Sequence, residues 1–177
     1  MSTPRRTRPP PLAATPRRNR QLIDSSQFPA LLEPRRPLRA VLVGWAATTI
    51  PALLLSFIVA SLLPKVAGPS FKDVGPAMVA MLVIGAPLLE TLIMAAVLEI
   101  LLLALPPKYA VIASSLGWGI AHSLMAPAWG LVIWWPFLIF STLYVTWRGR
   151  DRLAAIGIVF AVHALNNLGP ALLLLFA

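Results

Sequence analysis

The chain has 177 residues, of which 58% are hydrophobic and 12% are charged, with a formal net charge of +9 and no cysteine. Because a soluble domain has about 25% charged residues, this composition indicates an integral membrane protein. Its apolar runs are too long for the roughly ten-residue alternating strands of a membrane barrel, and the lack of cysteine excludes disulfides, thiolate metal sites and a cysteine nucleophile.

Residues 1–39 are predicted to form a disordered cytoplasmic tail. Nine arginines and eight prolines fall in this segment, which has too few apolar side chains to build a core. Its expected role is to set the orientation of the chain in the membrane. Contact between these arginines and anionic lipids is the alternative, and no nucleic-acid partner is expected because no aromatic residues interleave the arginines.

Residues 40–177 are predicted to form an all-α, polytopic transmembrane bundle of about five spans. By hydropathy the spans cover residues 40–63, 77–105, 109–125, 129–147 and 153–177. With the N-terminus in the cytoplasm, the cytoplasmic side holds 13 basic residues and the opposite side holds two. The positive-inside rule therefore predicts N-in, C-out topology, with the bacterial cytoplasmic membrane as the expected location.

Four ionisable side chains lie inside these apolar spans: Glu90 and Glu99 in the second, His122 in the third and His163 in the fifth. A charged group inside a membrane costs roughly a few kcal/mol or more, and it usually faces a protein interior or a wet cavity. A purely structural hydrogen bond between helices is one explanation. We favour a chemically active site, because two histidines and a carboxylate in three separate spans are hard to explain by packing alone.

Helix geometry places Glu90, His122, His163 and Asn167 at similar depth. At a rise of 1.5 Å per residue they lie about 15–23 Å from the cytoplasmic ends of their spans. His163 and Asn167 are four residues apart and therefore share one helix face. Glu99 lies on the opposite face from Glu90 and nearer the cytoplasm, so we predict a structural role for it.

The expected partner of Glu99 is Arg148 or Lys108. Pro87 and Pro170 each remove a backbone donor close to the polar residues, which loosens the local helix. Gly117 and Gly119 are expected to let neighbouring helices approach closely.

These residue types suit the addition of water to a carbonyl group. Glu90 can act as a general base, with a neighbouring histidine sharing the water molecule. Asn167 and a histidine donor beside it can stabilise a developing oxyanion. Glu90, His122 and His163 could instead form a two-histidine, one-carboxylate site for zinc or iron.

Three short motifs in this order resemble those of the CPBP intramembrane protease family, which is also called the CAAX protease and bacteriocin-processing (Abi) family. That family typically shows Glu-Glu-x-x-x-Arg, Phe-x-x-x-His and His-x-x-x-Asn on separate membrane helices. Here the matching positions are Glu90, Trp118 with His122, and His163 with Asn167. The resemblance covers residues 80–170, with departures at Thr91, where a second Glu is usual, and at Ala95, where Arg is usual.

The resemblance implies an intramembrane endopeptidase. Glu90 and His122 would activate the attacking water, and His163 and Asn167 would stabilise the oxyanion. No cofactor is expected, although the family has also been described as metal-dependent, which keeps a divalent metal such as zinc open. The expected partner is a membrane-associated peptide or protein substrate.

Two other functions remain as alternatives. Because the second glutamate and the arginine are both absent, neither is left buried without its partner. A non-catalytic immunity or scaffold protein of the same fold would therefore be stable with this sequence. A proton or metal-ion relay along Glu90, His122 and His163 is the third hypothesis.

Overall fold

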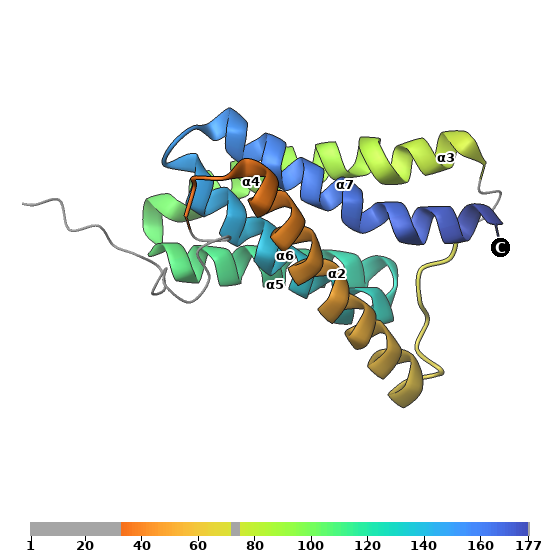
Figure 1. Cartoon of the computed structure of the whole chain (residues 1–177). Helices are drawn as coiled ribbons and strands as arrows, with labels where there is room; N and C mark the ends of the chain where they lie inside the picture. The colour runs from red at the N-terminus through yellow and green to blue at the C-terminus, as the bar shows by residue number, and fades with distance from the viewer. Residues whose placement is uncertain (1–32, 72–74, 177) are drawn as a thin grey trace, which may run out of the picture.

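The computed structural model describes residues 33–71 and 75–176, and in this part of the chain every regular element is a helix (Figure 1). The elements are α2 (Pro37–Leu62), α3 (Pro76–Ala80), η1 (Met81–Gly85), α4 (Ala86–Ala104), α5 (Pro107–Met125), α6 (Pro127–Arg148) and α7 (Arg152–Phe176). The all-α prediction is thus confirmed. Most of the predicted disordered tail, residues 1–32, lies outside the described residues.

The helix boundaries follow from prolines and one aspartate. Pro37, Pro76, Pro107 and Pro127 each occupy the first turn of a helix, where the missing N–H would have no intrahelical partner. Asp151 caps α7, since its carboxylate oxygens accept hydrogen bonds from the N–H groups of residues 153 and 154 at 3.0 and 3.3 Å. All five predicted spans coincide with helical segments to within three residues at each end.

Four helical segments are long and apolar enough to cross a membrane. They are α2, the continuous helix Pro76–Ala104 formed by α3, η1 and α4, then α6 and α7. Helix α5 occupies the predicted third span and has 19 residues, but it is more polar because it contains Lys108, Ser114, Ser115 and His122. The structure therefore establishes four candidate spans among the described residues, and a crossing by α5 stays a prediction.

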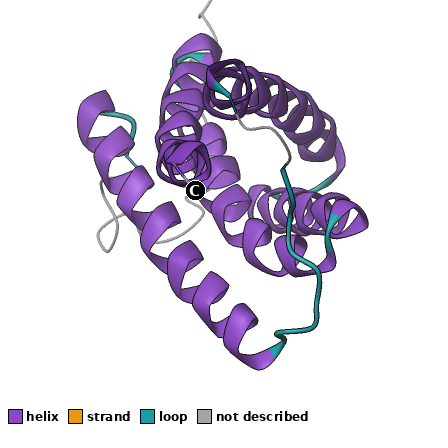
Figure 2. Ribbon diagram, turned by 90° about the vertical axis from the view of Figure 1, so that its right-hand side faces the viewer, coloured by secondary structure: helices purple, strands orange, loops and turns teal. Residues whose placement is uncertain are grey.

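Helix α6 is the centre of the bundle and packs against α2, α4, α5 and α7. Its buried face includes Phe137, Phe140, Leu143 and Tyr144, each 2% exposed or less. Helix α2 lies at the periphery, and its three buried residues all belong to its first half. Figures 1 and 2 both show its second half leaning away from α7 and α3.

Glycines allow α5 and α6 to pack closely. A Cβ atom added to Gly130 would collide with Ser123 Oγ and with the carbonyl oxygen of Gly119. A Cβ added to Gly119 would lie 3.0 Å from Trp134 Cβ. The expected close approach is therefore confirmed at Gly119 and wrong at Gly117, which is exposed and would have no atom within 4 Å of an added Cβ.

Replacement of Gly130 by alanine should lower the free energy of unfolding by about 1–3 kcal/mol, because the backbone of α5 would have to move away from α6. Thermal unfolding of the detergent-solubilised protein, followed by circular dichroism, measures the change. Gly117→Ala is the matched control and should leave the melting temperature nearly unchanged. Equal melting temperatures for the two variants would contradict the close contact between these helices.

Candidate functional site

Two of the predicted site residues, Glu90 and His163, meet from two helices, and His122 of a third helix contacts the same phenylalanine as His163. Glu90 of α4 and His163 of α7 face each other, with 3.6 Å between Glu90 Oε2 and His163 Nε2. The rings of His122 on α5 and His163 both contact Phe137 of α6, at centroid distances of 5.8 and 5.5 Å. Both histidines are buried, and the Glu90 side chain is 26% exposed. We call Glu90, His122, His163 and Asn167 the polar site.

The Glu90–His163 contact is slightly longer than a hydrogen bond. A heavy-atom distance of 3.6 Å lies outside hydrogen-bond range, yet it leaves no room for a water molecule between the two atoms. A shift of a few tenths of an ångström would form the bond. Catalytic hydrogen bonds are often long before a substrate is bound and shorten in the complex. The other ring nitrogen, His163 Nδ1, is buried without a hydrogen-bond partner among the described residues.

The tautomer of His122 follows from its backbone partner. His122 Nδ1 lies 2.9 Å from the carbonyl oxygen of Trp118, one turn earlier in α5. A carbonyl oxygen only accepts hydrogen bonds, so Nδ1 must carry the proton. In the neutral ring, Nε2 is then unprotonated and can accept a proton from a water molecule.

Aromatic side chains shield His122. Its ring lies edge-on to Trp129 at a centroid distance of 4.8 Å, and Trp129 in turn meets Phe71 at 6.1 Å. Phe71 belongs to the segment between α2 and α3, which is also held at this end by a backbone hydrogen bond from Ala128 to Ala67 of 3.1 Å. The segment therefore covers the His122 end of the polar site with apolar surface.

Asn167 stabilises the π-helical turn η1 within the continuous helix Pro76–Ala104. The N–H of Ala86 donates to the carbonyl of Met81, five residues earlier, as in a π-helical turn. The next donor in that register would be residue 87, but Pro87 has no N–H. Asn167 Nδ2 instead donates to the orphaned Leu82 carbonyl at 3.0 Å. This contact uses one of the two N–H groups of the amide.

Two residues outside the predicted site extend this connection to α2. Asn166 Nδ2 donates to Asn167 Oδ1 at 3.4 Å, and the Thr49 hydroxyl donates to Asn166 Oδ1 at 3.1 Å. The sequence carries a signal for this second contact, namely two adjacent asparagines in an apolar helix. Consecutive helical positions face different neighbours, so the two amides must contact different elements. Asn166 therefore faces α2 while Asn167 faces η1.

The two departures from the family pattern are buried. Thr91 is fully buried and Ala95 is 5% exposed, so both positions lie inside the bundle. The Thr91 hydroxyl has no hydrogen-bond partner among the described residues. A glutamate and an arginine at these positions would form an internal ion pair, and this chain has small side chains in their place.

Among the described residues, no three His, Asp or Glu side chains lie close enough together to hold a metal ion. The pairing of Glu90 with His163 supplies two possible ligands. His122 contacts Phe137, as His163 does, but it does not complete a three-residue ligand group with Glu90 and His163 among the described residues.

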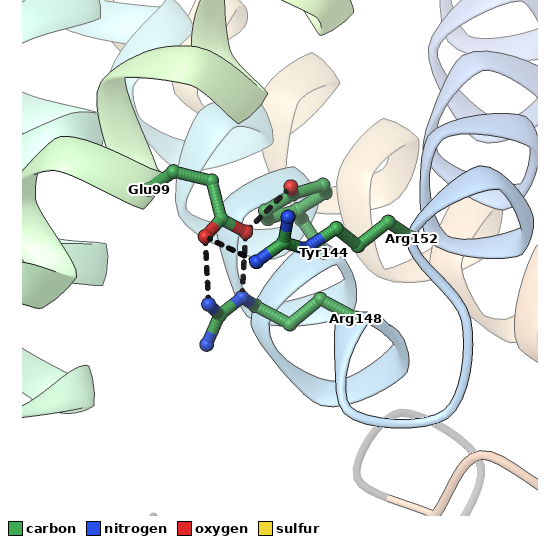
Figure 3. Close-up of polar contacts among 4 residues, drawn as sticks. All are labelled: Glu99, Tyr144, Arg148 and Arg152. Carbon is green, nitrogen blue, oxygen red and sulfur yellow. Dashed lines mark hydrogen bonds and ion pairs between the residues drawn. The ribbon is translucent and has the colours of Figure 1, made fainter.

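Glu99 lies in a different cluster near the end of the bundle (Figure 3). Arg148 donates to both carboxylate oxygens of Glu99, through Nε at 2.8 Å and Nη2 at 2.7 Å. The Tyr144 hydroxyl donates at 2.9 Å, and Arg152 adds a longer contact of 3.3 Å. The predicted structural pairing of Glu99 with Arg148 is confirmed. Lys108 instead lies over the ring of Tyr109, 4.7 Å from its centroid.

Comparisons of this chain with family models, with curated proteins and with solved structures find no match.

Replacement of Arg148 by glutamine should lower the free energy of unfolding by about 2 kcal/mol, because two short charged hydrogen bonds to Glu99 are lost. Arg152→Gln should cost less than about 0.5 kcal/mol, since its side chain is 68% exposed and makes one long contact. Denaturant titration in mixed micelles measures both values. Equal costs for the two arginines would contradict the bidentate pairing.

Asn167→Ala should cost about 1–3 kcal/mol, because the half-buried Leu82 carbonyl would lose its donor inside an apolar helix. In a Pro87→Ala background this cost should fall by at least about half, since residue 87 would then supply a backbone N–H. The same titration gives the double-mutant cycle. Pro170→Ala serves as the control background and should leave the cost of Asn167→Ala unchanged. If the costs of Asn167→Ala and Pro87→Ala simply add in the double variant, Asn167 does not replace the donor that Pro87 lacks.

Proposed function

We propose that this chain is an intramembrane endopeptidase resembling the CPBP family, which hydrolyses a peptide bond of a membrane-associated substrate. The observation that carries the proposal is the approach of Glu90 to His163, 3.6 Å apart, from two helices in the apolar interior of the bundle. Asn167 lies one helical turn from His163 on the same helix, and His122 contacts Phe137, which also contacts His163. Intramembrane ionisable groups brought together in this way are functional by default.

The proposed reaction begins with a water molecule that Glu90 activates as general base. Glu90 takes one proton, and the unprotonated Nε2 of His122 accepts a hydrogen bond from the same water. The water oxygen then attacks the peptide carbonyl carbon. When the C–N bond breaks, Glu90 returns the proton to the leaving nitrogen, which departs as an amine.

The same geometry supports an oxyanion role for His163 and Asn167. The attacking oxygen and the oxyanion are bonded to one carbon atom, so the groups that hold them must lie within a few ångströms of each other. The proximity of Glu90 and His163 meets this condition. A neutral His163 with a proton on Nε2 can donate to the oxyanion, and the second N–H of Asn167 supplies another donor.

We further propose five spans with the N-terminus in the cytoplasm. Helix α5 packs along α6, and short connections join it to α4 and α6, which supports a crossing. The turn between α6 and α7 carries Arg148, Arg150 and Arg152, whereas the segment after α2 carries Lys65 and Lys72. This charge asymmetry supports a cytoplasmic location for the α6–α7 turn and for the arginine-rich N-terminal segment.

A non-catalytic scaffold or immunity protein is the second candidate, and one observation favours it. Asn167 already holds the Leu82 carbonyl, so part of the polar site has a structural function. The small buried side chains at Thr91 and Ala95 also favour a scaffold, since the Glu–Arg pair typical of the CPBP motif is missing at these positions. The two candidates differ in what removal of the Glu90 carboxylate would do.

The decisive variant is Glu90→Gln, tested in proteoliposomes that contain a mixture of transmembrane peptides, with cleavage products identified by mass spectrometry. The wild-type chain should cleave at least one peptide, and Glu90→Gln should lower the rate by about 10²–10⁴-fold, because the general base is lost. Glu99→Gln removes a carboxylate outside the polar site. As the matched control it should keep the wild-type rate per folded molecule.

Other outcomes identify the alternatives. Cleavage by Glu90→Gln at the wild-type rate would reject Glu90 as the base. The absence of any cleavage, with unchanged folding, would favour the scaffold. Proton or metal-ion flux across the vesicles that depends on Glu90 would favour the relay. Loss of wild-type cleavage on addition of a chelator would assign a metal to the site.

A further inference from the structure

A pocket of about 410 Å³ lies where the start of α2 meets the end of α6 and the first turns of α7. Its apolar wall includes Pro37, Trp147, Ala154 and Ile158. The three α7 residues of the lining, at 154, 157 and 158, share one helix face. Gly157 leaves that face open, because a Cβ atom added there would have no other atom within 4 Å.

One end of this pocket is cationic. Arg150 lines it and is exposed, with Nη1 donating to the Pro34 carbonyl at 2.7 Å, which leaves its other N–H groups for a ligand. Asp151 also lines it, but its carboxylate is occupied in capping α7. The surrounding chain is basic. The start of α2 and the α6–α7 turn carry six arginines and two carboxylates, and a third carboxylate, Glu99 of α4, pairs with two of these arginines. The arginines are Arg35, Arg36, Arg39, Arg148, Arg150 and Arg152, and the two carboxylates are Glu33 and Asp151.

Trp147 forms part of the inner wall of the pocket. This residue borders the pocket and is 2% exposed, and its indole Nε1 is buried without an acceptor among the described residues. Buried indole N–H groups normally find a partner. A bound head group would reach Nε1 only after a side-chain movement, because this atom is not exposed on the pocket surface, whereas the exposed Arg150 can meet acceptor oxygens directly.

We propose that this pocket binds one anionic phospholipid, with its phosphate at Arg150 and the start of an acyl chain along Gly157 and Ile158. The combination of an apolar wall and a cationic mouth at the end of an apolar helix bundle fits an amphiphile of negative charge. Residues 1–32 of the same chain are the competing occupant. Their composition argues against it, because they carry six arginines and one aspartate and would be repelled by the basic mouth.

The test is lipid retention by the full chain in detergent, counted by native mass spectrometry with phosphatidylglycerol and phosphatidylcholine of identical acyl chains. Wild-type protein should retain one phosphatidylglycerol in preference to phosphatidylcholine. Arg150→Gln should weaken this binding by about fivefold, since one interfacial cation is lost. Gly157→Leu should weaken it at least as much by filling the apolar part.

Two matched variants serve as controls. Lys65→Gln removes the same charge at the far end of α2, and Gly117→Leu adds the same side chain to another exposed helical glycine. Both should retain phosphatidylglycerol to within about twofold of wild type.

Equal retention of the two lipids, or unchanged binding in both pocket variants, would overturn the proposal. Displacement of the lipid by free glycerol phosphate at similar concentration would assign the site to the phosphate group alone. A Gly157→Cys variant of this cysteine-free chain, labelled with a photoreactive benzophenone maleimide, distinguishes the lipid from the tail. If the label cross-links to residues 1–32 on illumination while no phosphatidylglycerol binds, the tail occupies the pocket and the proposal is overturned.

Discussion

The structure depends on one constraint: a backbone carbonyl inside an apolar helix must receive a hydrogen bond. Pro87 removes the donor that would serve Leu82 in the π-helical register, and the side chain of Asn167 replaces it from another helix. This bond joins α7 to η1, where the two elements also pack against each other. His163, one turn earlier on α7, lies opposite Glu90. The π-helical turn is therefore connected directly to the helix that carries His163 and Asn167.

Glu99 and Glu90 lie in the same helical segment, Pro76–Ala104, but differ in their hydrogen-bond partners. Glu99 has three donors within 3.3 Å, two of them arginines, and so it is fully committed to joining α4, α6 and α7. Glu90 has one neighbouring histidine at a distance longer than a hydrogen bond. A carboxylate that is already paired with arginine gains little by accepting a proton, whereas one beside an uncharged partner remains available for proton transfer.

The polar site and the lipid pocket lie at different levels of the same bundle. Helix α7 contributes to both, with His163 and Asn167 at one level and Gly157 and Ile158 nearer its start. The Thr49–Asn166 bond and the close contact of Gly44 with Val162 hold α2 against this helix. Beyond that point α2 makes little buried contact, so the first half of α2 is what closes the bundle.

The sequence by itself determined the helices, because span length, apolar composition and proline at helix starts are local properties. It also identified Glu90, His122, His163 and Asn167 as polar residues in apolar surroundings, and it left Arg148 and Lys108 as the two possible partners of Glu99. Only the tertiary structure decided that Glu90 meets His163, that Asn167 serves the Leu82 carbonyl, and that Gly119 rather than Gly117 faces another helix. Those facts depend on the rotation of each helix about its axis. That rotation is set by packing between helices distant in sequence, and hydropathy carries little information about it in an all-apolar span.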